Sequence, residues 1–228
     1  MKVELLEGEN VEELGIDRLK IIQSDKLYRF TSDAVLLTKF AAAKKGEKLA
    51  DFCSGSGIVG LHFYALNKNL IKEAHLFELQ PALANMSERS VLLNDLGGIF
   101  SVHNTPIAEI GAEFNNYFSL ILCNPPYEKA GAGEENLSES VRIARREVFT
   151  TLEEIVKVAA KKLKFGGRFC ISHRADRLVD VVCAMRDCGI EPKRVKFACG
   201  KNKAPYLLFA EGVKGGKPSL GIEPSIIN

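Results

Sequence analysis

The chain has 228 residues, 46% of them hydrophobic, and a formal net charge of +2, which suffices for one well-packed domain and points to no particular partner. Its amino terminus lacks an apolar signal core and no stretch is long enough to span a membrane, so we expect a soluble, cytoplasmic protein. The six cysteines include no C-x-x-C pair, which favours reduced thiols over disulfides or a zinc site.

Charge is distributed unevenly along the chain. Residues 141–228 contain 18 Lys and Arg against 9 Asp and Glu, whereas residues 1–140 contain 13 against 20. A basic carboxyl-terminal part can face a polyanionic nucleic acid, but lysine and arginine are also common on solvated helix faces. Charge alone leaves both interpretations open.

Residues 1–45 are expected to form a hairpin and a helix ahead of the main fold. Residues 18–23 and 27–30 alternate loosely between apolar and polar side chains on either side of a polar turn, which predicts a small β-hairpin. Thr31 or Ser32 can then cap a helix over residues 33–43. Asp33 lies in the first turn of this helix, where a carboxylate is favoured.

Residues 48–60 predict a strand, a glycine loop and a helix. Gly55 and Gly57 permit positive φ angles and close approach of a ligand to the backbone. Glu78 follows 21 residues after Gly57, at the end of the next predicted strand, where an acidic side chain can bind both ribose hydroxyls. Together these signals predict a site for a nucleoside cofactor. Asp51 stands before the glycines, and a carboxylate there suits the cationic end of S-adenosylmethionine better than a pyrophosphate.

A helix from about Pro81 to Asn94 and a strand over residues 99–103 come next. Asn104 ends that strand, where its amide can bind the adenine of a cofactor or can serve as a local turn residue. Thr105 and Pro106 are expected to cap and open a short helix. The four histidines show no ligand spacing, so no metal site is predicted.

The most informative motif is Asn124-Pro125-Pro126-Tyr127, which follows a short apolar run. This run over residues 118–123 predicts a buried parallel strand that delivers Asn124 to its carboxyl edge, where ligands bind in open α/β sheets. Asn124 and the Pro125 carbonyl can accept hydrogen bonds from a planar amine, and Tyr127 can stack on the ring that bears it. Asn and Pro are also ordinary turn residues, so the motif by itself is equally compatible with a stiff loop.

The remaining segments complete an α/β pattern. Residues 128–140 are polar and contain glycine, which predicts a mobile lid. A helical signal over residues 141–164, a strand over 168–172 and a helix over 178–187 follow, and two last strands near 195–198 and 206–210 are expected to close the sheet antiparallel. The tail from Gly212 onwards indicates a loose extension.

The combination of Asp51, Gly55, Gly57, Glu78 and the Asn-Pro-Pro-Tyr motif resembles the class I S-adenosylmethionine-dependent methyltransferases. More narrowly, the segments 30–37, 143–147, 166–169 and 210–216 resemble the bacterial valine-tRNA adenine-N6 methyltransferase family. The resemblance implies a Rossmann-like, seven-stranded, mainly parallel sheet with an antiparallel last strand and helices on both faces. Its core is expected over residues 46–212, with an extension over 213–228.

Site residues follow from the resemblance. It implies S-adenosylmethionine as cofactor, an adenine of tRNA as acceptor and no metal. The implied cofactor-binding residues are Asp33, Asp51, Cys53, Gly55, Gly57, Glu78, Asn104 and Asn124, and the implied catalytic residues are Asn124, Pro125, Pro126 and Tyr127. The family usually carries an acid where this chain has Asn104. Candidate phosphate contacts are Arg145, Arg146, Arg174, Arg177, Lys193, Arg194, Lys201 and Lys203.

Three other functions are compatible with the same residues. A protein glutamine methyltransferase uses the same motif, because a side-chain amide has an equally poor lone pair, but such enzymes usually carry a separate amino-terminal helical domain. A methyltransferase of guanine in ribosomal RNA would show the same turn and loop. A module that binds RNA and no longer reacts would keep the fold.

Overall fold

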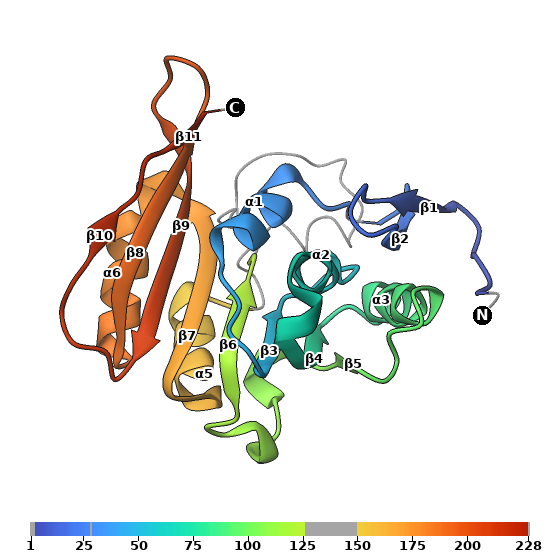
Figure 1. Cartoon of the computed structure of the whole chain (residues 1–228), viewed down its shortest axis with the longest axis horizontal. Coiled ribbons are helices and arrows are strands. Elements are labelled where there is room, and N and C mark those ends of the chain that lie inside the picture. The colour runs from blue at the N-terminus through green and yellow to red at the C-terminus, as the bar shows by residue number, and fades with distance from the viewer. Residues whose placement is uncertain (1–2, 28, 126–149, 228) are drawn as a thin grey trace.

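The computed structural model describes residues 3–27, 29–125 and 150–227. Its central feature is one twisted sheet (Figure 1). Seven strands form the body of the sheet: β3 (Glu47–Phe52), β4 (Ile71–Glu78), β5 (Phe100–Asn104), β6 (Phe118–Cys123), β7 (Leu163–Arg174), β8 (Ile190–Cys199) and β9 (Pro205–Lys214). They lie in the order β8-β9-β7-β6-β3-β4-β5, and β9 runs antiparallel to both of its neighbours while the other pairs are parallel. This confirms the predicted fold class.

Helices cover both faces of the sheet. On one face lie α1 (Ser32–Phe40), α2 (Ile58–Asn67) and α3 (Pro81–Leu93), and on the other α5 (Leu152–Lys162) and α6 (Leu178–Asp187). Short 3-10 turns connect them: η1 (Lys68–Leu70), η2 (Ile107–Glu109), η3 (Ala112–Phe114) and η4 (Ala175–Arg177). Strand β6 is buried along its whole length, with Leu120 and Leu122 packed towards α1–α3 and Ile121 and Cys123 towards α5. This two-sided burial explains its continuous apolar sequence.

The chain reverses its direction of sheet growth between β3 and β6. From β3 it adds β4 and β5 on one side, then returns to place β6 on the other side of β3. Phe52 at the end of β3 pairs with Cys123 at the end of β6, and Glu78 at the end of β4 pairs with Asn104 at the end of β5. The loops that follow these strands therefore meet at one edge, at the switch point where open α/β sheets bind ligands.

The amino-terminal hairpin exists, but its predicted pairing was wrong. Strand β1 (Glu9–Glu13) pairs antiparallel with β2 (Lys20–Ser24), so the partner of β2 lies upstream and not at residues 27–30. The reason is tertiary, because β2 lies along α3, where the Ile22 amide donates to the Ser90 hydroxyl at 2.9 Å and the Asn94 side chain binds the Lys20 backbone. Helix α1 also ends at Phe40, earlier than predicted, and no side-chain hydrogen bond caps its start at Thr31.

Two further helical predictions need correction. Thr105 does not cap a helix that Pro106 opens; instead Pro106 precedes the single 3-10 turn η2. Of the predicted helix over residues 141–164, the part over 141–149 lies outside the described residues; α5 begins after a capping box formed by Thr151 and Glu154 and ends at Lys162, because β7 begins at Leu163. The expected lid over residues 128–140 lies outside the described residues.

The carboxyl-terminal extension is not loose. Two short strands, β10 (Gly221–Ile222) and β11 (Ile226–Ile227), pair in parallel with β8 and so widen the sheet beyond β8. Glu223 adds an ion pair with Arg194 at 2.7 Å. In the part of the chain that the structure describes, no helix is both long and apolar enough to cross a membrane.

Candidate functional site

The loop between β3 and α2 is shaped by backbone conformations that few residues adopt. Cys53 leaves β3 with φ of +58°, a left-handed conformation that is strained for a residue with a side chain. Gly55 follows with φ of +55° and would have no atom within 4 Å of an added Cβ. At Gly60, by contrast, a Cβ would lie 2.4 Å from Leu76. The start of α2 is thus packed tightly against β4, whereas the loop leaves open space beside Gly55.

Asp51, on β3 just before this loop, is fully buried. Its Oδ2 accepts a hydrogen bond from the Gly60 amide at 2.8 Å, while its Oδ1 has no partner among the residues that the structure describes. Ser54 and Ser87 carry the other buried side-chain oxygens without a partner among the described residues, and Ser87 Oγ would lie 2.5 Å from a Cβ on Gly57. Buried polar atoms are normally paired, so three orphans around one loop fit a polar ligand there.

Burial raises the pKa of the Asp51 carboxyl to about 8; the Gly60 hydrogen bond opposes this shift and the charge of Glu78 adds to it. The carboxyl is therefore protonated at neutral pH when no cation neutralises it.

A cationic ligand should consequently bind better as pH rises towards 8. For S-adenosylmethionine we expect the affinity to increase by up to about tenfold per pH unit between pH 6 and 7.5, because binding must remove the Asp51 proton. Calorimetric titration at several pH values measures this. Asp51→Asn should bind weakly with little pH dependence, and a pH-independent affinity of the native protein over this range would contradict the role of Asp51.

Glu78, at the end of β4, holds two loops together. Its Oε2 accepts from the Gly55 amide and its Oε1 from the Gln80 amide, both at 2.8 Å. The side chain is nearly buried, and this burial raises the pKa of its carboxyl. Each carboxylate oxygen can accept a second hydrogen bond, so this arrangement is compatible with a ribose contact as well.

The amino-terminal hairpin contacts the same loop, and no motif in the sequence predicts this contact. Gln23 on β2 is 1% exposed, and its Nε2 donates to the Ser56 hydroxyl at 2.7 Å and to the Ile22 carbonyl at 3.0 Å. Its Oε1 accepts from the Phe30 amide at 3.4 Å. Gln23 therefore fixes the glycine loop against the hairpin and the start of α1.

Replacing Gln23 by Ala should loosen the glycine loop. Loss of the hydrogen bond to Ser56 is expected to weaken cofactor affinity about fivefold, corresponding to about 1 kcal/mol, and to lower the melting temperature. Lys26→Ala is the matched control, because Lys26 lies on the same hairpin but forms only an exposed ion pair with Glu7. Equal cofactor affinities of the two variants, measured by calorimetry, would rule out this role of Gln23.

Asn124 follows β6 beside β7. The register pairs Cys123 with Ile171, which brings Ser172 next to Asn124, and the Ser172 hydroxyl donates to Asn124 Oδ1 at 2.6 Å. Ser172 is fully buried, so it orients the amide from within the protein. Pro125 is also buried, whereas Pro126 and Tyr127 lie outside the described residues. No sequence signal marked Ser172, because its importance depends on the register of two distant strands.

Cys53 follows strand β3, and Cys123 ends the neighbouring strand β6. Burial raises the pKa of the Cys123 thiol, and a hydrogen bond with the Cys53 thiol adds to the shift. All six cysteines of the chain are free.

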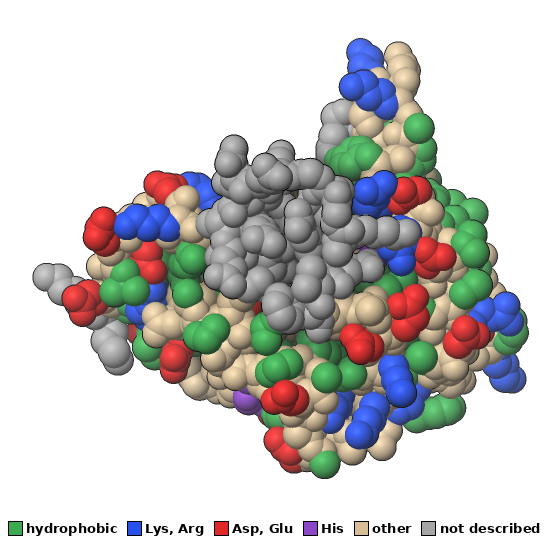
Figure 2. All heavy atoms as spheres, turned by 180° about the vertical axis from the view of Figure 1, so that it is seen from behind, with side chains coloured by type: hydrophobic (Ala, Val, Ile, Leu, Met, Phe, Trp, Pro, Cys, Tyr) green, Lys and Arg blue, Asp and Glu red, His purple; other side chains and the backbone are tan. Residues whose placement is uncertain are grey.

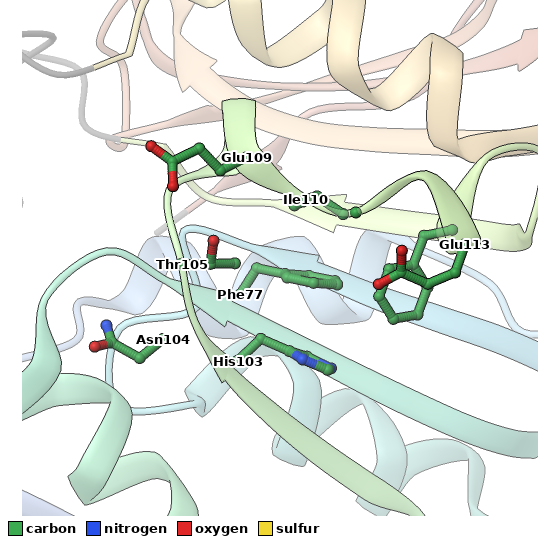
Figure 3. Close-up of a pocket in the computed structure, with 9 residues that line it drawn as sticks. Phe77, His103, Asn104, Thr105, Glu109, Ile110 and Glu113 are labelled. Carbon is green, nitrogen blue, oxygen red and sulfur yellow. The ribbon is translucent and has the colours of Figure 1, made fainter.

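Asn104 lies at the rim of a cavity of about 340 Å³. Phe77, His103 and Phe114 give this cavity an aromatic lining, and Glu109 and Glu113 an acidic rim (Figure 3). Asn104 points away from His103, and its Nδ2 donates to the carbonyls of Glu78 and Leu79 at 2.9 and 3.0 Å. The Nδ2 group thus has the role of a local turn residue, whereas Oδ1 accepts no hydrogen bond from the described residues.

Asp33 stays apart from this cluster of hydrogen bonds. It is half-buried in the first turn of α1, burial raises the pKa of its carboxyl, and the Ser32 hydroxyl lies 3.4 Å from its Oδ1. No hydrogen bond or ion pair among the described residues joins it to the glycine loop. Among those residues there is also no group of three or more His, Cys, Asp or Glu side chains able to hold a metal ion.

Two relatives that are similar to this chain in sequence share one name. Relatives from a Flavobacteriaceae bacterium (strain 3519-10) and Erwinia tasmaniensis, both named tRNA1(Val) (adenine(37)-N6)-methyltransferase, are 23% and 25% identical over 154 and 140 residues. These matches cover 68% and 61% of this chain but only 63% and 56% of the relatives.

Solved structures share the fold. A predicted O-methyltransferase from Agrobacterium tumefaciens superposes with a TM-score of 0.65 at 19% identity, over 86% of each chain. Geranyl diphosphate C-methyltransferase from Streptomyces coelicolor, in complex with S-adenosyl-L-homocysteine, gives 0.58 at 10% identity over 80% of this chain and 77% of that one. The family described as Methyltransferase small domain matches residues 30–179. Because this match covers more than half of the chain, the chain belongs to that family of S-adenosylmethionine-dependent methyltransferases.

Proposed function

We propose that the protein transfers a methyl group from S-adenosylmethionine to the exocyclic amine of an adenine in tRNA. The observation that carries this proposal is the position of Asn124, one strand away from Asp51 and oriented by the Ser172 hydroxyl. The names of the tRNA-modifying relatives support the choice of adenine and of tRNA. A tRNA substrate implies a cytoplasmic protein.

The proposed catalytic task of Asn124 and Pro125 is to orient the amine. The lone pair of an adenine amine is delocalised into the ring, so the amine is a poor nucleophile. Acceptance of its two hydrogens by Asn124 Oδ1 and the Pro125 carbonyl favours a more tetrahedral nitrogen with its lone pair directed outwards. A carbonyl oxygen has two lone pairs, so acceptance from Ser172 is compatible with acceptance from the amine. S-adenosylmethionine supplies an electrophilic methyl on its sulfonium, and solvent takes the released proton.

The substrate base must leave its stack to reach Asn124, as in other enzymes that act on bases. Tyr127 is the proposed stacking platform for the extruded ring, and Pro126 the residue that stiffens the turn between them. Both lie outside the described residues, so their roles rest on the motif.

The proposed cofactor residues surround the glycine loop. The three orphaned buried oxygens and the open space above Gly55 are compatible with a polar cofactor at this place. Asp51 would receive its cationic end and Glu78 its ribose, with Asn104 and the adjoining cavity at the adenine. The remaining residues proposed to line the cofactor are Asp33, Cys53, Gly55, Gly57 and Asn124.

Labelled methyl transfer tests the substrate class. The protein and methyl-labelled S-adenosylmethionine are incubated with one of three substrates at a time. These substrates are total tRNA, ribosomal RNA and a protein extract, each from a strain that lacks the protein. We expect label in tRNA. Label in protein would favour glutamine methylation, label in ribosomal RNA would favour guanine methylation, and no label in any fraction would favour a non-catalytic RNA-binding module.

A further inference from the structure

A hairpin projects beyond the edge of the sheet that carries Asn124 and Asp51. Strand β7 pairs with β9 no further than Arg174 with Leu207, whereas β8 and β9 continue to the pair Cys199 and Pro205. Residues 199–206, here called the β8–β9 arm, therefore extend past the end of β7 (Figure 1). Because β8 runs in the same direction as β6 and β7, the arm extends from the carboxyl edge, on the side of the proposed active site.

The arm lies within reach of a substrate held at Asn124. Ser172, which contacts Asn124, pairs with Phe209 on β9. Tyr206 is three residues from Phe209, a distance of roughly 10 Å along a strand. A nucleic acid with one base at Asn124 would therefore pass the arm with neighbouring nucleotides.

The arm is basic and exposed. No acidic residue occurs between Glu191 and Glu211, and residues 201–206 are all exposed. Lys201 and Lys203 lie at the turn, and no ion pair of the described residues includes either of them. Arg194 and Lys196, further from the turn on β8, are instead bound to Glu211 and Glu223. Figure 2 shows basic side chains at the end of this projection.

The arm is also held in shape. The Lys203 amide donates to the Gly200 carbonyl at 2.9 Å, which closes the turn, and Asn202 adopts φ of +57°. On the outer side, β11 pairs with β8 at Ala198 and Cys199, next to the arm. The carboxyl-terminal extension thus braces the arm, a role that its sequence did not indicate.

We infer that the β8–β9 arm is an RNA-binding element whose lysines contact backbone phosphates flanking the methylated base. This inference rests on the proposed function and deepens it. Two ammonium groups that form no ion pair with a described carboxylate, on a rigid projection, suit phosphates, which position a nucleic acid without reading its sequence.

The test compares two double variants in their affinity for tRNA from a strain that lacks the protein. Lys201→Ala with Lys203→Ala removes the arm lysines. Lys44→Ala with Lys45→Ala is the matched control, because these two lysines are also exposed and precede β3 at the opposite edge of the sheet. Binding is measured between 50 and 200 mM salt, the range over which phosphate contacts dominate the salt dependence of affinity.

The slope of log affinity against log salt is negative, and each lost phosphate contact should reduce its magnitude by about 0.7 to 0.9. The magnitude of the slope should therefore be smaller by about 1.4 to 1.8 in the arm variant. We expect an approximately tenfold weaker affinity, a raised KM for tRNA, an unchanged kcat at saturating tRNA and unchanged cofactor affinity. The control variant should match the native protein. An unchanged slope in the arm variant, or an equal loss in both variants, overturns the inference while methylation of tRNA by the native protein still stands. If the native protein methylates only protein, the proposed function fails and the arm inference with it.

Discussion

Replacing Asn124 by Ala is expected to lower methyl transfer by about 10³-fold or more while the affinity for S-adenosylmethionine stays within about threefold of the native value. The side chain would orient only the acceptor amine, so its loss removes the geometry of the reaction and leaves the glycine loop intact. Transfer is measured with labelled cofactor, and affinity by calorimetry. Full activity of this variant would show that the amine is not held by Asn124.

Ser172→Ala extends the same test, because the Ser172 hydroxyl donates to Asn124 and is itself not proposed to touch the substrate or the cofactor. Its hydroxyl fixes the Asn124 amide at 2.6 Å, so its removal should reduce kcat about tenfold and leave KM and cofactor affinity unchanged. Ser119→Ala serves as the control. Ser119 is also a buried serine with a hydrogen-bonded hydroxyl, but it binds Glu47 near the opposite end of β6. A fall in kcat only for Ser172→Ala would separate positioning from general destabilisation.

Glu78→Ala should weaken cofactor binding about 100-fold and lower stability. The variant leaves the buried Gln80 amide and the partly buried Gly55 amide without the Glu78 acceptor, at a cost of about 1–3 kcal/mol for the buried amide and less for the other, and removes the proposed ribose contact. Because the acceptor site would stay intact, kcat at saturating cofactor should fall much less than in the Asn124 variant.

Glu73→Ala is the control for Glu78. Glu73 lies on the same strand and accepts a hydrogen bond from Tyr117 at 2.7 Å, far from the glycine loop. Its loss should lower the melting temperature but leave cofactor affinity unchanged. If both glutamate variants weakened the cofactor equally, the effect would be one of global stability and Glu78 would have no specific role.

The sequence predicted those elements that local chemistry determines. Helix α6 has the predicted bounds, and Gly189 follows its end with φ of +74°. Strand β6 was predicted from a short apolar run that stops before Pro125 and Pro126. In the structure all residues of this strand are buried. In both cases the stop signal lies next to the element, so no long-range information is needed.

Long-range register decides the features that the sequence did not reveal. The partner of β2 depends on its packing along α3, where Ser90 and Asn94 bind its backbone. Gln23 reaches Ser56 across 33 residues, and Ser172 reaches Asn124 across 48. A buried polar residue on a strand can be recognised in sequence, but its partner cannot, because one step of register would turn it to the other face.

Nucleoside mass spectrometry of tRNA treated with the protein and isotope-labelled S-adenosylmethionine tests the central claim most directly, because it identifies the atom that receives the methyl group. The tRNA comes from a strain that lacks the protein, and the Asn124→Ala variant is run in parallel. We expect labelled N6-methyladenosine with the native protein and none with the variant. Labelled methylguanosine, or label in tRNA that is equal for both proteins, would contradict the proposed transfer to an adenine amine held by Asn124.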